Sequence, residues 1–430
     1  MLQTVIGILL LLSYVIFAIY AAKGGNLMIG FFVMAVLWCV LGSIAGVVNW
    51  DTINAKVFQG GPEGYGGTVV IIIFGSWFGR VMLETGIAKT IITKAVELGG
   101  DNPAVATILL VLVTSIIFTS SYGAGAVIAI GVIVFPIMLS LGIPKPVAVS
   151  AFVMAVGAGM YLNMAQLSQM VVLVPGYKLT DGYYTFGFMA FGVQLVVIII
   201  MILISTRKSK LNHAWAAQSN VNGDSGNGSN LLSLLTPLIP VVLSIFFGWK
   251  SIPSLILAIL FAFVTTGKIK NFTKFTSVVQ KTFYDGVCDV AMVFAFLFFL
   301  QMFVKSAGAC SVLLKPIISP LVPHNSFILF LGFGVFSILG LFRGPLTAWG
   351  AGTATLAMMQ STGMYSAAVL FPLFYIPSVS MNISCCPTQS WNLWSINFVK
   401  INVKQFMRSI TFWGWLVCLI NSMLAYFILV

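Results

Sequence analysis

The chain alternates between long apolar runs and short polar breaks over its whole length. Continuous apolar segments lie at residues 3–21, 27–48, 68–88, 147–173 and 186–205, and again at 232–247, 253–267, 286–304, 366–399 and 409–429. A helix needs about 20 such residues to cross a bilayer. A membrane β-barrel would show short alternating segments instead. The pattern therefore predicts an all-α polytopic membrane protein with five crossings in each half.

Two further apolar stretches are broken near their middle by polar residues and glycines. They lie at residues 103–141 and 326–361, and their breaks fall at 120–125 and 342–350. Each stretch is long enough to enter the membrane, turn and leave on the same side. We expect each to be a re-entrant helical hairpin with its tip inside the membrane.

The two broken stretches also resemble each other. Residues 119–143 read TSSYGAGAVIAIGVIVFPIMLSLGI, and residues 340–364 read GLFRGPLTAWGAGTATLAMMQSTGM. Without gaps, Gly123 aligns with Gly344 and Gly131 with Gly352. Matched halves with glycine-broken apolar segments are the best sequence indication of a transport site. We expect a first repeat at residues 1–205, a polar cytoplasmic linker at 206–230, and a second repeat of inverted topology at 231–430.

Composition and charge support this arrangement. The chain is 60% hydrophobic and only 7% charged, with a net charge of +12. A soluble domain carries about a quarter charged residues, so this surface must face lipid. With the N-terminus outside, most lysines and arginines fall on the side of the linker, which explains most of the excess charge. The expected location is a bacterial-type cytoplasmic (inner) membrane.

The bias of basic residues toward one side of the membrane does not account for Arg343, which lies at the predicted tip of the second hairpin, within LFRGPLTAWGAG. Helix starts at such a tip expose N–H groups that favour an anion. Gly344 lets the backbone approach a ligand, and Thr347 adds a hydroxyl. An arginine fork suits a carboxylate. We predict substrate contact, with structural pairing of Arg343 as the alternative.

The first tip reads FTSSYGAGA and offers hydroxyls rather than a charge. These hydroxyls and free amides can bind a carboxylate, a sugar hydroxyl or Na⁺. The alternative is helix capping and close packing by small residues, which is common in membranes. The candidates here are Thr119 for a coupling ion, and Ser120, Ser121, Tyr122 and Gly123 for substrate.

Each hairpin is followed by a span that polar residues interrupt, VGAGMYLNMAQLSQ in one half and IPSVSMNISCCPTQSWN in the other. Clustered amides and prolines are costly against lipid but suit an unwound helix that lines a polar cavity. Asn163 and Asn382 occupy corresponding positions and are the best neutral ligands. Thr388 is a further substrate candidate and Ser384 a coupling-ion candidate. Interhelical hydrogen bonding is the alternative for all four.

Acidic residues are scarce. Glu84 lies one helical turn after Arg80, so the two are expected to pair on one helix face. Asp289 is a candidate proton carrier within the span at 286–304. Since no pair of acidic residues accompanies either tip, coupling by H⁺ or by Na⁺ stays open.

Other classes of protein lack support in the sequence. It contains no P-loop, nucleophile elbow or His/Cys metal spacing, so we expect no cofactor, no metal site and no enzymatic activity. An ATP-driven pump would need a soluble nucleotide domain. Nucleic acid is not an expected partner, whereas membrane lipid is.

The two repeats, each with a hairpin and an interrupted helix, resemble the ion transporter superfamily over almost the whole chain. FGSWFGRVMLETGIAKTII followed by the SSYGAG tip is most similar to gluconate- and citrate-type permeases. The Ser-Asn-Thr signature of the divalent-anion sodium symporters is absent. The resemblance implies a homodimer in which a domain carrying the hairpins slides against a scaffold.

The sequence thus predicts a secondary active transporter of a small organic anion, such as gluconate, citrate or a dicarboxylate, coupled to H⁺ or Na⁺. A Na⁺/H⁺ antiporter on the same scaffold is the alternative. A membrane-embedded enzyme would need a cluster of His, Asp or Glu at one membrane face, which the sequence does not show.

Overall fold

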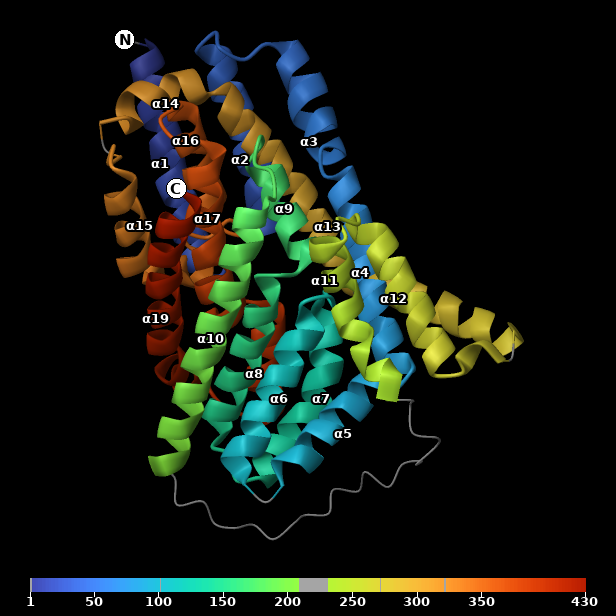
Figure 1. Cartoon of the computed structure of the whole chain (residues 1–430). Coiled ribbons are helices and arrows are strands. Elements are labelled where there is room, and N and C mark those ends of the chain that lie inside the picture. Colours follow the sequence, from blue (N-terminus) through green and yellow to red (C-terminus); the bar gives the residue numbers. More distant parts are fainter. Residues whose placement is uncertain (1, 101, 209–230, 271, 321) are drawn as a thin grey trace.

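The computed structural model describes residues 2–100, 102–208, 231–270, 272–320 and 322–430. Every regular element in these ranges is helical (Figure 1). The predicted linker lies outside them apart from residues 206–208, which end a helix. The helices of the first half are α1 (Leu2–Ala22), α2 (Leu27–Ile44), η1 (Thr52–Gln59), α3 (Gly60–Glu63), α4 (Gly66–Glu84), α5 (Ile87–Gly99), α6 (Pro103–Phe118), α7 (Ala124–Ser140), α8 (Lys145–Met160), α9 (Met164–Leu173) and α10 (Asp181–Lys208).

The second half begins with two short apolar helices and one long helix, and it ends with a long apolar helix. Its elements are η2 (Leu231–Leu238), α11 (Ile239–Phe246), α12 (Ser251–Thr265), η3 (Lys268–Lys270), α13 (Phe272–Ala309), α14 (Ser311–Ile318), α15 (Ser326–Val335), η4 (Ser337–Arg343), α16 (Gly352–Thr362), α17 (Ala367–Pro377), η5 (Ser378–Ile383), α18 (Ser390–Val399) and α19 (Val403–Leu429).

The apolar runs of the sequence become helices that are suited to a membrane. Six helices of the described residues are long and apolar enough to cross one, and up to eight if each of two sharply bent pairs is a span. This is fewer than the ten crossings that the runs predict, because α12 and the helical segments 232–246 and 367–383 are apolar but shorter. One of the two bent pairs, α15 with η4, belongs to the predicted second hairpin rather than to a predicted crossing. The outer faces of α1 and α2 are exposed and apolar, as Ile16 at 68% and Val33 at 55% exposure show. Such faces fit contact with lipid.

Each predicted hairpin coincides with helices joined by a short connection, while their re-entry into the membrane stays a prediction. The first consists of α6 and α7, and the second of α15, η4 and α16. In Figure 1 α6 and α7 lie in the lower half of the molecule, whereas α15 and α16 lie in the upper half, so the hairpins extend from opposite ends toward the middle. Opposite entry is what charge counting leads us to expect. The repeat relationship between the two halves remains a prediction.

The interrupted spans are also found. The axis turns by 65° between α8 and α9, where Tyr161, Leu162 and Asn163 leave the helix. In the second half, π-helical η5 and an irregular turn separate α17 from α18. Every residue of α8 from Ala148 to Met160 is buried, as expected for a helix that is apolar on all sides. Because α8 leads into the bend before α9 and packs against η5, it positions both interruptions.

Several elements differ from the predictions, among them α13 and α5. The helix α13 begins at Phe272, well before the expected span at 286–304, because its first turns are amphipathic rather than apolar. The helix α5 has no counterpart among the predicted spans. It buries Ile87, Ala88, Ile92 and Ala95 along one face, while Lys89 and Lys94 stay exposed. This spacing is typical of a helix that lies along a surface.

Candidate functional site

The first tip is the five-residue connection from Thr119 to Gly123, between the end of α6 and the start of α7. Gly123 has a φ of +103°, a value that other residues adopt only under strain. A Cβ at Gly123 would also come within 3.1 Å of Val290 and 3.3 Å of the Ser76 hydroxyl. Glycine therefore lets the tip pack directly against α4 and α13.

Asn163 ties the break between α8 and α9 to this tip. Its Nδ2 donates to the carbonyls of Phe118 and Ser121, both at 2.9 Å, and its Oδ1 accepts from the N–H of Gln166 at 3.1 Å. These bonds satisfy carbonyls that the end of α6 leaves free. Both amide protons of Asn163 are thus engaged inside the protein, which favours a framework role over direct ligand contact.

Most hydroxyls of the first tip are engaged as well. Thr119 donates to the carbonyl of Ile116 at 2.7 Å, and Ser120 donates to the carbonyl of Pro237 at 2.8 Å. Tyr122 accepts a hydrogen bond from Gln169 at 2.9 Å. The buried Ser121 hydroxyl differs, because it has no partner among the described residues.

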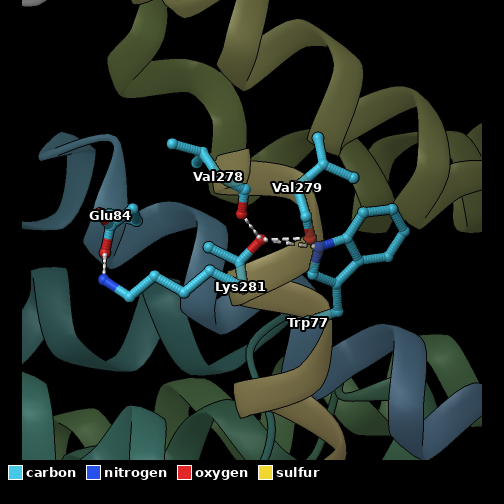
Figure 2. Close-up of polar contacts among 6 residues, drawn as sticks. Trp77, Glu84, Val278, Val279 and Lys281 are labelled. Atoms are coloured by element: carbon cyan, nitrogen blue, oxygen red, sulfur yellow. Dashed lines mark hydrogen bonds and ion pairs between the residues drawn. The ribbon is translucent and has the colours of Figure 1, made fainter. Parts of the chain in front are cut away.

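A partly buried ion pair lies beside the first tip. Arg80 on α4 donates from Nε and Nη2 to the two carboxylate oxygens of Asp289 on α13, both at 2.5 Å. The predicted pair of Arg80 and Glu84 is wrong. Glu84 binds Lys281 of α13 instead, at 3.1 Å. A second contact between the same helices is the indole of Trp77, which donates to Thr282 at 3.1 Å (Figure 2). Because α13 packs along α4, the carboxylate of Asp289 can accept two hydrogen bonds from the guanidinium of Arg80.

The second tip runs from η4 to α16 through an irregular stretch. Phe342 and Arg343 have φ values of 53° and 58°, so two consecutive residues other than glycine adopt the left-handed region. Such conformations cost energy and cluster at functional sites. The stretch is closed by the N–H of Ala351, which donates to the carbonyl of Arg343 at 2.8 Å. The N–H of Gly352 donates to the carbonyl of Gly344 at 3.1 Å.

Arg343 has no acidic partner in the part of the chain that the structure describes. Its guanidinium donates to the carbonyl of Trp349 at 3.3 Å, to the carbonyl of Thr388 at 3.5 Å and to the side-chain oxygen of Gln389 at 3.3 Å. It also lies 6.0 Å from the ring centre of Phe296 on α13. All these contacts are long or neutral, so the charge of Arg343 is not compensated by the protein.

Unpartnered polar atoms accompany this arginine. The hydroxyl of Thr347 and both polar atoms of the Asn382 side chain are buried, and none has a hydrogen-bond partner among the described residues. Asn382 belongs to η5, which packs against η4, and the N–H of Ala348 donates to Ser378 of η5 at 2.8 Å. Leaving a buried polar group unpaired costs about 1–3 kcal/mol. Such groups call for a water or a ligand.

The two remaining candidates of this half have internal partners. Ser384 donates to the carbonyl of Val379 at 2.8 Å and accepts from Gln194 at 3.1 Å. The hydroxyl of Thr388 contacts the thiol of Cys386 at 2.9 Å, and its carbonyl accepts from Arg343. Ser384 thus joins helices, whereas Thr388 stays next to the arginine.

Gln169 of α9 connects the two tips and was missed by sequence reasoning. Its Nε2 donates to the hydroxyl of Tyr122, and its Oε1 accepts from the indole of Trp349 at 3.2 Å. A signal was present, because Gln169 follows Gln166 by three residues and so lies on nearly the same helix face. The structure thereby places the tips of the two hairpins on either side of one buried amide.

One face of α13 contacts both tips. Asp289, at the first tip, and Phe296, under Arg343, are seven residues apart on this helix. Seven residues are two helical turns, so both side chains share a face and lie about 10 Å apart along the axis. Arg80 and Arg343 are therefore anchored at two levels of the same helix.

A groove of about 570 Å³ opens between α4, α9 and the loop after α9. Thr68, Ser168 and Tyr177 line it together with Lys178, the charged residue of its wall. A second cavity beside Thr119 and Ser120 measures only about 10 Å³, which is too small for an organic substrate. No group of three or more His, Cys, Asp or Glu that could hold a metal occurs among the described residues.

Comparison with known proteins gives a fold but no sequence family. No protein-family model matches the chain, and no curated protein sequence matches it. The structure is similar to the crystal structure of the YdaH transporter from Alcanivorax borkumensis, with a TM-score of 0.64 and 14% sequence identity. The match covers 94% of this chain and 98% of the other. The chain thus has the all-helical fold of a known membrane transporter, while the gluconate- and citrate-type resemblance stays a prediction.

Proposed function

We propose that this protein is a secondary active transporter that moves a small organic anion across a bacterial-type cytoplasmic membrane, driven by H⁺ or Na⁺. The observation that carries this proposal is Arg343. It stands at the strained tip of a hairpin, has no acidic partner in the described part of the chain, and neighbours the unpartnered Thr347. An uncompensated charge inside a membrane is costly, so such a charge points to a function that requires it.

The proposed substrate is a carboxylate such as gluconate, citrate or a dicarboxylate. Arg343 would bind one carboxylate through its fork, replacing its long bonds to neutral carbonyls with charge-assisted ones. Gly344 leaves backbone exposed at the same tip, and Thr347 and Asn382 would bind hydroxyls or the second carboxylate oxygen. Ser121 would contribute its free hydroxyl from the opposite tip.

The groove beside α4 and α9 supports an approach path for such an anion. Lys178 lies in its wall, and a cation at the mouth of a low-dielectric cleft attracts anions. We propose elevator-type alternating access, in which the hairpins and interrupted helices move together against the remaining helices, and a homodimer as the assembly. The link that Gln169 makes between the tips supports movement of both hairpins as one unit.

Uptake into proteoliposomes tests the proposal. Purified protein is reconstituted, and accumulation of labelled gluconate, citrate, succinate and lactate is measured under an imposed pH gradient or Na⁺ gradient. We expect gradient-dependent accumulation of at least one anion. If none accumulates under either gradient, the proposed function is wrong.

A Na⁺/H⁺ antiporter is the second candidate, and Asp289 favours it, since it is a largely buried carboxylate beside a hairpin tip. This alternative predicts Na⁺-driven proton flux without any organic anion. A pH-sensitive dye inside the same vesicles distinguishes the two functions.

A further inference from the structure

The carboxylate of Asp289 lies directly against the start of α7. A Cβ on Gly125, in the first turn of α7, would overlap both carboxylate oxygens of Asp289. The first turn of a helix carries free N–H groups and the positive end of the helix dipole, which favour an anion. Asp289 thus places a carboxylate between Arg80 and this helix start, where an external anion would otherwise be favoured.

Two unpartnered hydroxyls mark the same place. Ser76, one turn before Arg80 on α4, is 1% exposed, and its hydroxyl would lie 3.3 Å from a Cβ on Gly123. Ser121 of the tip is fully buried, and its hydroxyl would lie 3.8 Å from a Cβ on Gly79 of α4. Neither hydroxyl has a partner among the described residues. Both therefore lie unpaired at the contact between α4 and the first tip, where a movement that separates the two would expose them to a ligand.

We propose that Asp289 is a tethered substitute for a substrate carboxylate, that the second acidic group of a dicarboxylate replaces it at Arg80, and that Asp289 takes up one proton when this happens. The proposal rests on the proposed function, and it specifies both the substrate class and the coupling ion. One carboxylate would bind Arg343 at the second tip. The other would bind Arg80, Ser76 and Ser121 at the first tip, at the other level of α13.

The charges balance in this exchange. Without substrate, Arg80 and Asp289 neutralise each other and Arg343 carries one uncompensated positive charge. When a dianion spans both arginines, an ionised Asp289 would be a third negative charge against two positive ones. A proton from water that binds one carboxylate oxygen of Asp289 removes this excess, and the loaded site is neutral. A monocarboxylate needs only Arg343, so it binds without displacing Asp289 and without a proton.

Few other charges face Asp289. Along α13, Asp285 lies one turn away, and Cys288 is exposed beside it. On α4, Glu84 is held by Lys281, while α2 carries only the buried thiol of Cys39 and α7 and α16 carry no ionisable side chain. The elements that pack elsewhere along α13, namely η1, α3, η3 and α14, carry Lys56, Glu63, Lys268, Lys270 and Lys315. Arg80 is thus the cation that pairs with Asp289.

The test compares proton uptake on binding of succinate with that on binding of gluconate. Purified protein in weakly buffered detergent solution receives each anion at a pH where succinate is fully ionised, and a pH indicator reports the protons taken up per anion bound. We expect about one proton per succinate and none per gluconate. In Asp289→Asn we expect no proton for either anion, whereas the matched surface variant Glu97→Gln behaves as the unaltered protein.

Infrared difference spectra on the unaltered protein give an independent readout. With ¹³C-labelled succinate, a new protonated-carboxyl band at the unlabelled position should appear with succinate but not with gluconate. Equal proton uptake for both anions, no uptake with succinate, binding of gluconate alone, or unchanged uptake in Asp289→Asn would each overturn this inference and leave the proposed function standing. Binding of no carboxylate at all would contradict the proposed function itself.

Discussion

The two hairpin tips have similar sequences, but they differ in how many of their polar groups are bound by other parts of the protein. The first tip is filled by the protein itself, because Asn163 caps its carbonyls and the Arg80–Asp289 pair lies against the start of α7. At the second tip, the arginine is bound to neutral oxygens, and Asn382 of the adjacent η5 has no side-chain partner among the described residues. The comparison teaches that corresponding positions in a repeat need not share a role. Here the protein's own side chains occupy most of the first tip, whereas the second tip keeps a cation without an acidic partner among the described residues.

The largest expected effect comes from Arg343. Replacing it by Ala removes the cation that binds the carboxylate, and we expect uptake to fall by roughly a hundredfold, since loss of one partner of a buried charge pair costs 2–5 kcal/mol. Arg343→Lys keeps the charge but loses the fork, so we expect roughly a tenfold loss. Uptake assays in proteoliposomes measure both.

Arg408→Lys is the matched control, because Arg408 is exposed on α19 and touches neither tip. Full transport by Arg343→Ala would show that the second tip does not bind the anion.

The two asparagines give the sharpest contrast between framework and site. Asn163→Ala leaves two buried carbonyls unpaired, and we expect it to destabilise the protein by about 3 kcal/mol. Asn382→Ala removes an amide that has no partner in the part of the chain that the structure describes, so we expect a stability change below about 1 kcal/mol but weaker anion binding. Thermal unfolding in detergent and anion binding are measured side by side. Equal loss of stability in both variants would remove the distinction between the tips.

The contact between Asp289 and the start of α7 is tested by adding one carbon atom. Gly125→Ala would push the carboxylate of Asp289 away from the start of α7. We expect the free energy of unfolding to fall by about 1–3 kcal/mol and proton uptake with succinate to change. Gly332→Ala on α15 is the control, because a Cβ there meets no atom within 4 Å. The melting temperatures of the two variants should differ clearly. An unaffected Gly125→Ala would mean that Asp289 does not lie against this turn.

The smallest effect is expected at the outer ion pair of the same helices. Glu84 and Lys281 are 39% and 58% exposed, so Glu84→Gln should change stability by less than about 0.5 kcal/mol. Transport should stay unchanged, in contrast to Asp289→Asn. Thermal unfolding and uptake measure both quantities, and a strong loss in Glu84→Gln would extend the functional site to the end of α4.

The sequence predicts much of the fold because apolar runs and glycine breaks are local signals. The connection between α6 and α7, the interruption at Asn163 and the irregular stretch that carries Arg343 follow from such signals. The partner of Arg80 does not, because it depends on how α13 packs along α4, far away in the chain. For the same reason, the sequence could not show that Asn163 is bonded while Asn382 is free. Local pattern locates polar residues, and packing decides which of them remain available.

The central claim, that the second tip binds the anion, is tested most directly by determining the structure with substrate bound. The protein in lipid nanodiscs would be imaged with a saturating amount of the anion that accumulates best in vesicles. We expect a carboxylate about 3 Å from the guanidinium of Arg343, which then releases the carbonyl of Trp349. If Arg343 keeps its bond to Trp349 and the anion lies elsewhere, the account is wrong.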